Sequence, residues 1–123
     1  MAEHHQTGKS GEERAAAYLS QKGYEILGRN ERFGKAEIDI VARIGNEIVF
    51  VEVKTRTGNY FGFPEEAIDQ QKIALMGKAA EQYAEENPEA QEIRFDLISL
   101  VLGSGTEEIV HIEDAFFPGT AQF

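Results

Sequence analysis

The sequence predicts a single domain of the α/β class, more closely an α+β domain with a mixed sheet. Two stretches, 9–22 and 64–86, space their apolar residues as amphipathic helices do. Five shorter stretches alternate apolar and polar residues or are rich in β-branched residues, as strands are. The order helix, three strands, helix, two strands is typical of a mixed sheet with helices. The 123 residues suffice for one domain over 1–123, with 1–7 and 117–123 expected to be poorly ordered.

The first predicted helix occupies residues 9–22. Its apolar stripe has the i, i+3, i+4 spacing of one helix face and consists of Ala15, Ala16, Tyr18 and Leu19. Ser10 suits the N-cap because Glu13 follows three residues later, as in a capping box. Gly23 is expected to end the helix, since glycine readily adopts the left-handed conformation found after a helix end.

Three strands are predicted next, over 24–30, 36–44 and 47–56. A loop over 30–35 is expected between the first two strands. Gly45 and Asn46 separate the second and third strands, and they suit a two-residue turn with glycine at its first central position. The third strand, EIVFVEVKTR, has the strongest strand pattern in the chain.

The remaining elements follow an aromatic, glycine-rich loop at 57–64. Pro64 is expected near the first position of the second helix, where its fixed φ and missing N–H are tolerated. The apolar stripe of this helix consists of Ile68, Leu75, Met76, Ala79 and Tyr83. Asn87 is expected to end it, and two strands over 92–102 and 107–112 complete the fold.

The central hairpin carries charges at opposed positions. With the predicted turn, Asp39 lies opposite Glu52. The same register places Glu37 opposite Lys54, and alternation puts all these charges on one face. The residues expected to point the other way are Ile38, Ile40, Val49, Val51 and Val53.

Two opposed carboxylates in an apolar hairpin suggest a cation site. Opposed Cβ atoms lie about 4.5–5.5 Å apart, and like charges about 4 Å apart repel by about 4 kcal/mol at an effective dielectric constant of about 20. A divalent cation between Asp39 and Glu52 would relieve the repulsion, since hard cations bind carboxylate oxygens. Lys54 would then hold or activate a water, or neutralise developing oxyanion charge.

Glu12 and Lys72 extend this candidate site to the two helices. Each stands at helical spacing from the apolar stripe of its helix, so both are expected to project toward the sheet. Simpler interpretations remain open. They are a cross-strand ion pair between Glu37 and Lys54, a solvated face for Asp39 and Glu52, an ordinary helix-start carboxylate at Glu12 and a surface lysine at Lys72.

The net charge of −10 argues against a nucleic-acid partner, but the distribution of charge weakens that argument. Residues 1–78 carry 11 basic and 12 acidic residues, whereas 79–123 carry one basic and ten acidic residues. The six basic residues from Arg29 to Arg56 therefore predict a locally basic face on an acidic protein.

Several chemistries are excluded or assigned no role. The absence of cysteine excludes disulfides, thiolate catalysis and cysteine-bound metals. No apolar run approaches a membrane span and the first residues are polar, so we expect a cytoplasmic protein without membrane contact. The histidines, His4, His5 and His111, lack metal-ligand spacing. Asp96 is expected to pair with Arg94 or a backbone group, without a role in chemistry.

The motif Asp39…Glu52-Val53-Lys54 resembles the PD-(D/E)XK nuclease superfamily, whose fold is restriction-endonuclease-like. Nearly the whole chain is similar to the YraN-like family of uncharacterised bacterial proteins. That similarity rests on Gly8, Glu12, Ala15, Tyr18, Leu19, Gly23, Asn30, 37–40, 50–56, Lys72, 94–96, 111–112 and 115–116. One departure is Ala36, where the family usually has glycine. The resemblance implies an α-β-β-β-α-β core, here with an additional C-terminal strand, and an active site at Glu12, Asp39, Glu52 and Lys54.

Together these observations lead to the hypothesis of a metal-dependent nuclease that hydrolyses phosphodiester bonds. Asp39 and Glu52 would hold Mg²⁺ or Mn²⁺, with the Val53 carbonyl and Glu12 as further ligands. Lys54 would position the nucleophile or stabilise the transition state. The expected substrate is DNA, including branched or junction DNA. The residues expected to contact it are Arg29, Arg32, Lys35, Arg56 and Lys72.

Two other classes of function remain open from the sequence. One is a catalytically inactive module on the same fold that binds nucleic acid or another protein. The other is a purely structural acidic domain. A homodimer is compatible with each of these hypotheses.

Overall fold

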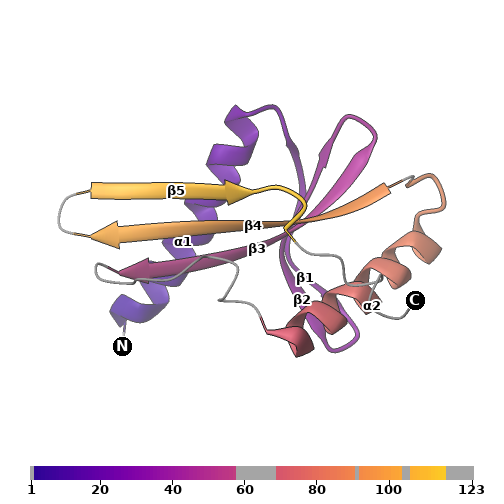
Figure 1. Cartoon of the computed structure of the whole chain (residues 1–123), viewed down its shortest axis with the longest axis horizontal. Helices are drawn as coiled ribbons and strands as arrows, with labels where there is room; N and C mark the ends of the chain where they lie inside the picture. Colours follow the sequence, from indigo (N-terminus) through magenta and orange to yellow (C-terminus); the bar gives the residue numbers. More distant parts are fainter. Residues whose placement is uncertain (1, 58–68, 91, 104–105, 116–123) are drawn as a thin grey trace.

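The computed structural model describes residues 2–57, 69–90, 92–103 and 106–115 (Figure 1). In these parts of the chain the elements follow the predicted order, α-β-β-β-α-β with an additional C-terminal strand. They are α1 (Ala2–Gln21), β1 (Glu25–Phe33), β2 (Ala36–Ile44), β3 (Glu47–Thr57), α2 (Gln70–Glu86), β4 (Glu92–Gly103) and β5 (Thr106–Ile112). The predicted α+β mixed-sheet class, with the element order of a restriction-endonuclease-like core, is confirmed.

The described strands form one sheet in the order β1-β2-β3-β4-β5. Neighbouring strands are antiparallel except β3 and β4, which pair in parallel over their whole described lengths. A parallel pair requires a crossover connection, and α2 lies within the connection between these two strands. None of the helices described is long and apolar enough to cross a membrane.

Each helix has its own hydrophobic core against the sheet, with α1 passing behind the sheet in Figure 1. The α1-side core consists of Ala15, Leu19, Tyr24, Ile40, Ala42, Val49, Val51, Ile98 and Leu100. The α2-side core consists of Phe33, Ala36, Ile38, Val41, Ile48, Phe50, Met76, Ala79 and Phe95. Alternate residues of β3 enter the two cores, which explains the near-continuous apolar run of that central strand.

A kink in β1 and β2 reverses which core the side chains enter. Ile40 lies in the α1-side core, but Ile38, two residues earlier, lies in the α2-side core. Regular alternation would place both on one face, so the prediction that they point the same way is wrong for Ile38. On β1, Asn30 has a φ of +53°, a left-handed conformation within a strand. The paired residues on either side of Asn30 place it opposite Asp39 at this kink.

Beyond the kink, β2 no longer pairs with β3. The residue pairs of β2 and β3 follow the register predicted from the Gly45-Asn46 turn, where Gly45 has a φ of +58°. The pair farthest from the turn is Ile40 with Val51. Asp39 and Glu52 occupy the next position of that register. The kink thus leaves these two carboxylates at the point where the strands separate.

Two predicted helix starts are wrong. Because α1 begins at Ala2, Ser10 is a residue within the helix rather than its N-cap, and residues 2–7 are helical. The second helix begins at Gln70 instead of Pro64, because Asp69 is the N-cap: its side chain accepts a hydrogen bond of 2.8 Å from the Lys72 backbone N–H.

One predicted loop is shorter than expected. β1 continues to Phe33, so that only a tight turn separates it from β2. Gly34 takes a φ of +61° in that turn, a conformation that glycine adopts without strain. Residues 58–68 and 117–123, for which the sequence predicts a loop with a helix start and a poorly ordered end, lie outside the described residues.

Candidate functional site

Glu52 is the most buried carboxylate of the predicted site. It lies on β3, only 5% exposed. Its Oε1 is 3.5 Å from Lys72 Nζ, and its Oε2 is 3.8 Å from Lys54 Nζ. Oε1 accepts no hydrogen bond from the described part of the chain although it is buried. A buried carboxylate oxygen without a hydrogen bond has unused capacity to bind a cation or an ordered water.

Asp39 reaches β3 from the kink in β2. Its Oδ2 accepts a hydrogen bond of 2.8 Å from the Val53 backbone N–H. This bond joins β2 to β3 just beyond their last paired residues. It holds the Asp39 carboxylate beside Glu52, as the hairpin register predicts, and it also brings Val53 into the site.

The surroundings of Asp39 disfavour its charge. Burial and, next, the negative charge of Glu52 raise the pKa of Asp39 to about 7, and the charge of Glu12 adds to this effect. The hydrogen bond from Val53 and the charge of Lys72 act in the opposite direction but are outweighed. Both of the other predicted carboxylates therefore act electrostatically on Asp39.

Glu12 enters the site because α1 packs very closely on the sheet. A Cβ atom at the preceding residue, Gly11, would lie 2.2 Å from Thr55 Oγ1 of β3, so only glycine permits this approach. Glu12 Oε1 accepts a hydrogen bond of 3.2 Å from Asn30 Nδ2 and lies 3.7 Å from Arg29 Nη2. The predicted inward projection of Glu12 is thus observed, with β1 providing its partners.

The two predicted lysines converge on Glu52 from different elements. Lys72 of α2 also donates a hydrogen bond of 3.4 Å from Nζ to the Glu37 carbonyl oxygen, so it connects β2 with β3. Lys54 forms its ion pair with Glu52 and not with Glu37. The alternative of a cross-strand ion pair between Glu37 and Lys54 is therefore wrong, because β2 has already left β3 at these positions.

The carboxylates do not form a closed metal cage in this structure. Among the residues described, no three acidic or histidine side chains lie close enough together to surround a metal ion. Glu12 accepts a hydrogen bond from Asn30 of β1, and Glu52 is paired with two lysines. The donor set nevertheless suits a hard divalent cation, because it consists of carboxylate oxygens, one of which is buried without a hydrogen bond.

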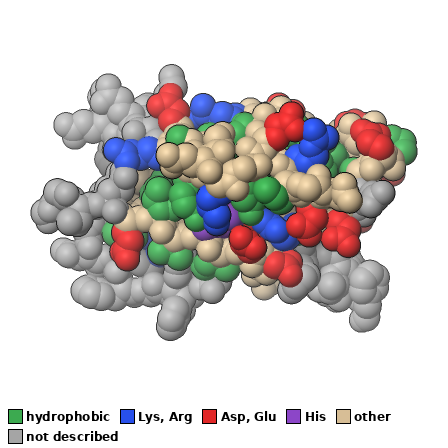
Figure 2. Space-filling view, turned by 90° about the horizontal axis from the view of Figure 1, so that it is seen from above, with side chains coloured by type: hydrophobic (Ala, Val, Ile, Leu, Met, Phe, Trp, Pro, Cys, Tyr) green, Lys and Arg blue, Asp and Glu red, His purple; other side chains and the backbone are tan. Residues whose placement is uncertain are grey.

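The predicted nucleic-acid contacts divide into two groups. Arg29 and Lys72 lie beside the carboxylates, at Glu12 and Glu52 respectively. Arg32 and Lys35 are exposed at the far end of the β1–β2 hairpin, and Arg56 lies farther along β3. Basic and acidic side chains are interspersed over the face of the molecule seen in Figure 2. The predicted contacts thus do not gather at one place: two lie at the carboxylates and three lie farther away.

A second polar cluster, to which the sequence assigns no chemistry, is centred on the fully buried Asp96 of β4. Arg94 donates two hydrogen bonds to its carboxylate, of 2.9 and 2.8 Å, and the Asp114 backbone N–H donates another of 3.0 Å. Asp96 is therefore paired both with Arg94 and with a backbone group, the two partners that the sequence suggests. The ring of His111 is also bonded to Asp96, at 2.8 Å. Burial alone would raise the pKa of Asp96, but these hydrogen bonds outweigh burial and lower it.

Sequence analysis missed the part of His111 in this cluster because β5 is separated from Asp96 by the turn after β4. The antiparallel pairing of β4 with β5 brings the histidine back beside the aspartate. Arg94 further contacts Tyr24 Oη at 2.6 Å and Glu47 Oε1 at 3.0 Å. The cluster joins β3, β4, β5 and Tyr24, the residue before β1, at one point.

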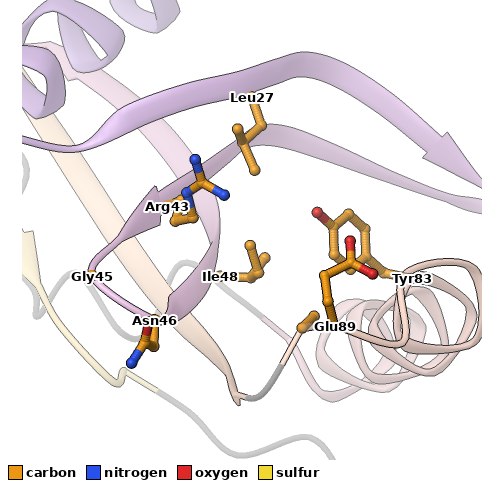
Figure 3. A pocket seen from close by; sticks show the side chains of 8 residues that line it. Leu27, Arg43, Gly45, Asn46, Ile48, Tyr83 and Glu89 are labelled. Atoms are coloured by element: carbon orange, nitrogen blue, oxygen red, sulfur yellow. The ribbon is translucent and has the colours of Figure 1, made fainter.

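The structure also contains a pocket of about 150 Å³ at the other end of α2 from Lys72 (Figure 3). Its lining residues are Leu27, Arg43, Gly45, Asn46, Ile48, Tyr83, Glu89 and Ala90. None of the predicted site residues lines this pocket. The candidate site is therefore separate from this pocket.

Comparison with known proteins defines the relatives of the chain. Residues 11–100 match the model of a family described as "Uncharacterised protein family UPF0102". A UPF0102 protein of Christiangramia forsetii is 45% identical over 117 residues, covering 95% of this chain and 98% of the relative. A UPF0102 protein of Phocaeicola vulgatus is 47% identical over 118 residues, covering 96% and 98%. The chain belongs to the UPF0102 family.

Among solved structures, SfsA of Pyrococcus furiosus in complex with Ca²⁺ matches with a TM-score of 0.37 and 17% identity. The match covers 89% of this chain and 63% of SfsA. A similarity of this size supports no conclusion about function or ligands. The family assignment, in contrast, agrees with the YraN-like resemblance inferred from the sequence.

Proposed function

We propose that this protein is a metal-dependent nuclease that cleaves phosphodiester bonds in nucleic acid. The observation that carries the proposal is the convergence of Glu12, Asp39 and Glu52 from three elements, with a buried Glu52 oxygen that accepts no hydrogen bond from the described residues. Such an arrangement is costly to the fold, because burial and the charges of Glu52 and Glu12 disfavour the charge of Asp39. A bound divalent cation would offset this cost.

In this proposal each residue of the site has a separate task. Mg²⁺ or Mn²⁺, when bound, polarises the phosphodiester and lowers the pKa of a bound water. Asp39 and Glu52 supply the principal carboxylate ligands, and Glu12 and the Val53 carbonyl complete the set. The hydrogen bond from Val53 N–H to Asp39 fixes the orientation of that carboxylate.

The basic residues act on the nucleic acid rather than on the metal. Lys54, whose Nζ is 3.8 Å from Glu52, would leave that carboxylate to orient the nucleophile or neutralise charge on the phosphate. Lys72 would contact the phosphate from α2. Arg29, Arg32, Lys35 and Arg56 would contact the backbone of the substrate on either side.

The test combines a cleavage panel with cation binding. Labelled linear, flapped and four-way-junction DNA and an RNA are incubated with Mg²⁺ or Mn²⁺, and Mn²⁺ uptake is measured by titration calorimetry. Asp39→Asn and Glu52→Gln should each weaken Mn²⁺ binding and abolish cleavage, since each keeps the side-chain shape but removes a charge. Lys54→Ala should abolish cleavage while Mn²⁺ binding survives, because an ammonium group is no ligand for a cation.

A second candidate is a nucleic-acid-binding module without cleavage. The observation that favours it is the pairing of Glu52 with two lysines, which already neutralises the carboxylate without a metal. This candidate predicts that wild-type protein binds nucleic acid but takes up no Mn²⁺ at millimolar concentration, even with nucleic acid present. That outcome would replace the nuclease proposal with the binding module.

A further inference from the structure

Asn30 stands at the kink of β1 and touches the candidate site through its side chain. Its Nδ2 donates a hydrogen bond of 3.2 Å to Glu12 Oε1. Its backbone, at a φ of +53°, forms the kink opposite Asp39. We propose that Asn30 is a positioning residue of the metal site, which aims Glu12 through its amide and places Asp39 through its backbone. This inference deepens the proposed function and rests on it.

The backbone part of the proposal follows from the conformation. Residues other than glycine rarely adopt a left-handed φ, and asparagine is among the side chains that tolerate it best. Only Asn30 and Asp114 do so among the non-glycine residues described. At Asn30 the consequence is visible, because the side chains of Ile38 and Ile40 change cores across the kink. Without it, β2 would continue to alternate regularly past Asp39.

The amide part follows from the partners of Glu12. The carboxylate comes from α1, but Asn30 and Arg29, which contact it, come from β1. An amide N–H fixes the direction of a carboxylate oxygen and leaves its negative charge in place for a cation. Groups that orient metal ligands in this way commonly contribute strongly to metal affinity. Arg29 alone would do this less well, since its Nη2 is 3.7 Å away.

The two roles together select the residue type at position 30. Glycine would accept the left-handed backbone but lacks an amide side chain. Aspartate would tolerate the backbone but would place a second carboxylate against Glu12, and the like charges would repel. Alanine would fail in both respects. Asparagine, in contrast, meets both requirements.

The test compares Asn30→Gly and Asn30→Ala with wild type. Asn30→Gly should unfold at a temperature no lower than that of Asn30→Ala, since glycine accepts the left-handed backbone without strain. Its Mn²⁺ affinity should nevertheless be roughly 10- to 100-fold lower than that of wild type. Asp114→Gly is the matched control, because it changes the other left-handed residue away from the site and should leave Mn²⁺ affinity unchanged. Mn²⁺ binding by Asn30→Gly equal to that of wild type would overturn the proposal.

A second measurement does not depend on the proposed function. Thermal unfolding of Asn30→Gly, Glu12→Ala and the double variant, without metal, reports whether the two side chains interact. The double variant should lose less stability than the two single variants together, since either change removes the same contact. Additive losses would refute the positioning role even if the wild type cleaves nucleic acid. Coupled losses in a protein that binds no Mn²⁺ would overturn the proposed function and leave only the contact.

Discussion

Asp39 shows how one residue links the candidate site to the stability of the fold. Its pKa rises to about 7 because the side chain is buried and lies near Glu52. In the unfolded chain the same carboxyl has its ordinary pKa of 3.8. Between these two values the folded protein holds a proton that the unfolded chain has lost. Stability of the metal-free protein must therefore decrease as the pH rises through this range.

We expect metal-free wild-type protein to be less stable at pH 8 than at pH 4.5 by about 2–4 kcal/mol from this group, since each unit of pKa difference corresponds to about 1.36 kcal/mol. Asp39→Asn removes the ionisation and should remove most of this difference. Urea unfolding in the presence of a chelator measures it. An equal pH dependence in wild type and variant would show that Asp39 ionises normally in the fold.

Arg94 and Arg43 provide a comparison between a buried and an exposed ion pair. Arg94 neutralises the fully buried Asp96, whereas the pair between Arg43 and Glu25 has both side chains about half exposed. Removing one partner of a buried pair leaves a charge without compensation, which typically costs about 3–5 kcal/mol. An exposed pair typically contributes about 0–1 kcal/mol.

Arg94→Met should therefore lower the free energy of unfolding by about 3–5 kcal/mol, whereas Arg43→Met should change it by about 1 kcal/mol or less. Chemical denaturation at neutral pH distinguishes them. Similar small losses of unfolding free energy in both variants would mean that the Asp96 carboxylate becomes hydrated or that His111 alone compensates its charge.

At the scale of elements, the close approach of α1 to β3 determines where Glu12 lies. The contact occurs at Gly11, where an added Cβ would lie 2.2 Å from Thr55 Oγ1. Gly11→Ala should force the helix away from the strand and destabilise the fold by about 1–3 kcal/mol, as overpacking does. Since the obstacle is the threonine hydroxyl, Gly11→Ala combined with Thr55→Ala should recover most of the loss. Thermal unfolding of the three variants tests this, and a double variant as unstable as Gly11→Ala would place the obstacle elsewhere.

The sequence predicts elements well where a local pattern determines them. The bounds of β2 and the register at the Gly45-Asn46 turn follow from alternation and turn chemistry, and they are observed. The separation of β2 from β3 at Asp39 could not be predicted, because a left-handed asparagine within a strand has no distinct pattern. The N-cap at Asp69 was overlooked because Pro64 gives an equally plausible helix start.

For the site, the sequence predicts which residues come together but not how they are held. Register and helical spacing suffice to bring Asp39, Glu52, Glu12 and Lys72 to one region. The Asn30–Glu12 contact and the Asp39–Val53 hydrogen bond depend on a kink and on helix packing, which are tertiary effects. Residue spacing therefore predicts which candidate residues come together, but not the contacts that hold Glu12 and Asp39 in place.

At the scale of the whole molecule, the acidic last third and the basic residues at the end of the β1–β2 hairpin should make nucleic-acid binding strongly dependent on salt. Binding weakens as salt rises, with a slope set by the number of phosphates contacted. Arg32→Glu and Lys35→Glu, at the exposed hairpin end, should each reduce that slope by about 1. Lys78→Glu, exposed on α2, is the control and should leave the slope unchanged. Binding titrations over a series of salt concentrations measure these slopes. Equal slopes for wild type and all variants would contradict phosphate contacts by Arg32 and Lys35.

The parallel pairing of β3 with β4 has a consequence for any attempt to isolate the site. Glu12, Asp39, Glu52 and Lys54 all lie before residue 58, in the α1-β1-β2-β3 part of the chain. In a fragment of that length β3 would lose β4, and one of its sides would become a sheet edge with unsatisfied N–H and C=O groups. An apolar edge strand of this kind is a template for aggregation. These four residues come from the first half of the chain, but they cannot be separated from the second half, which supplies the strand that covers this edge of β3.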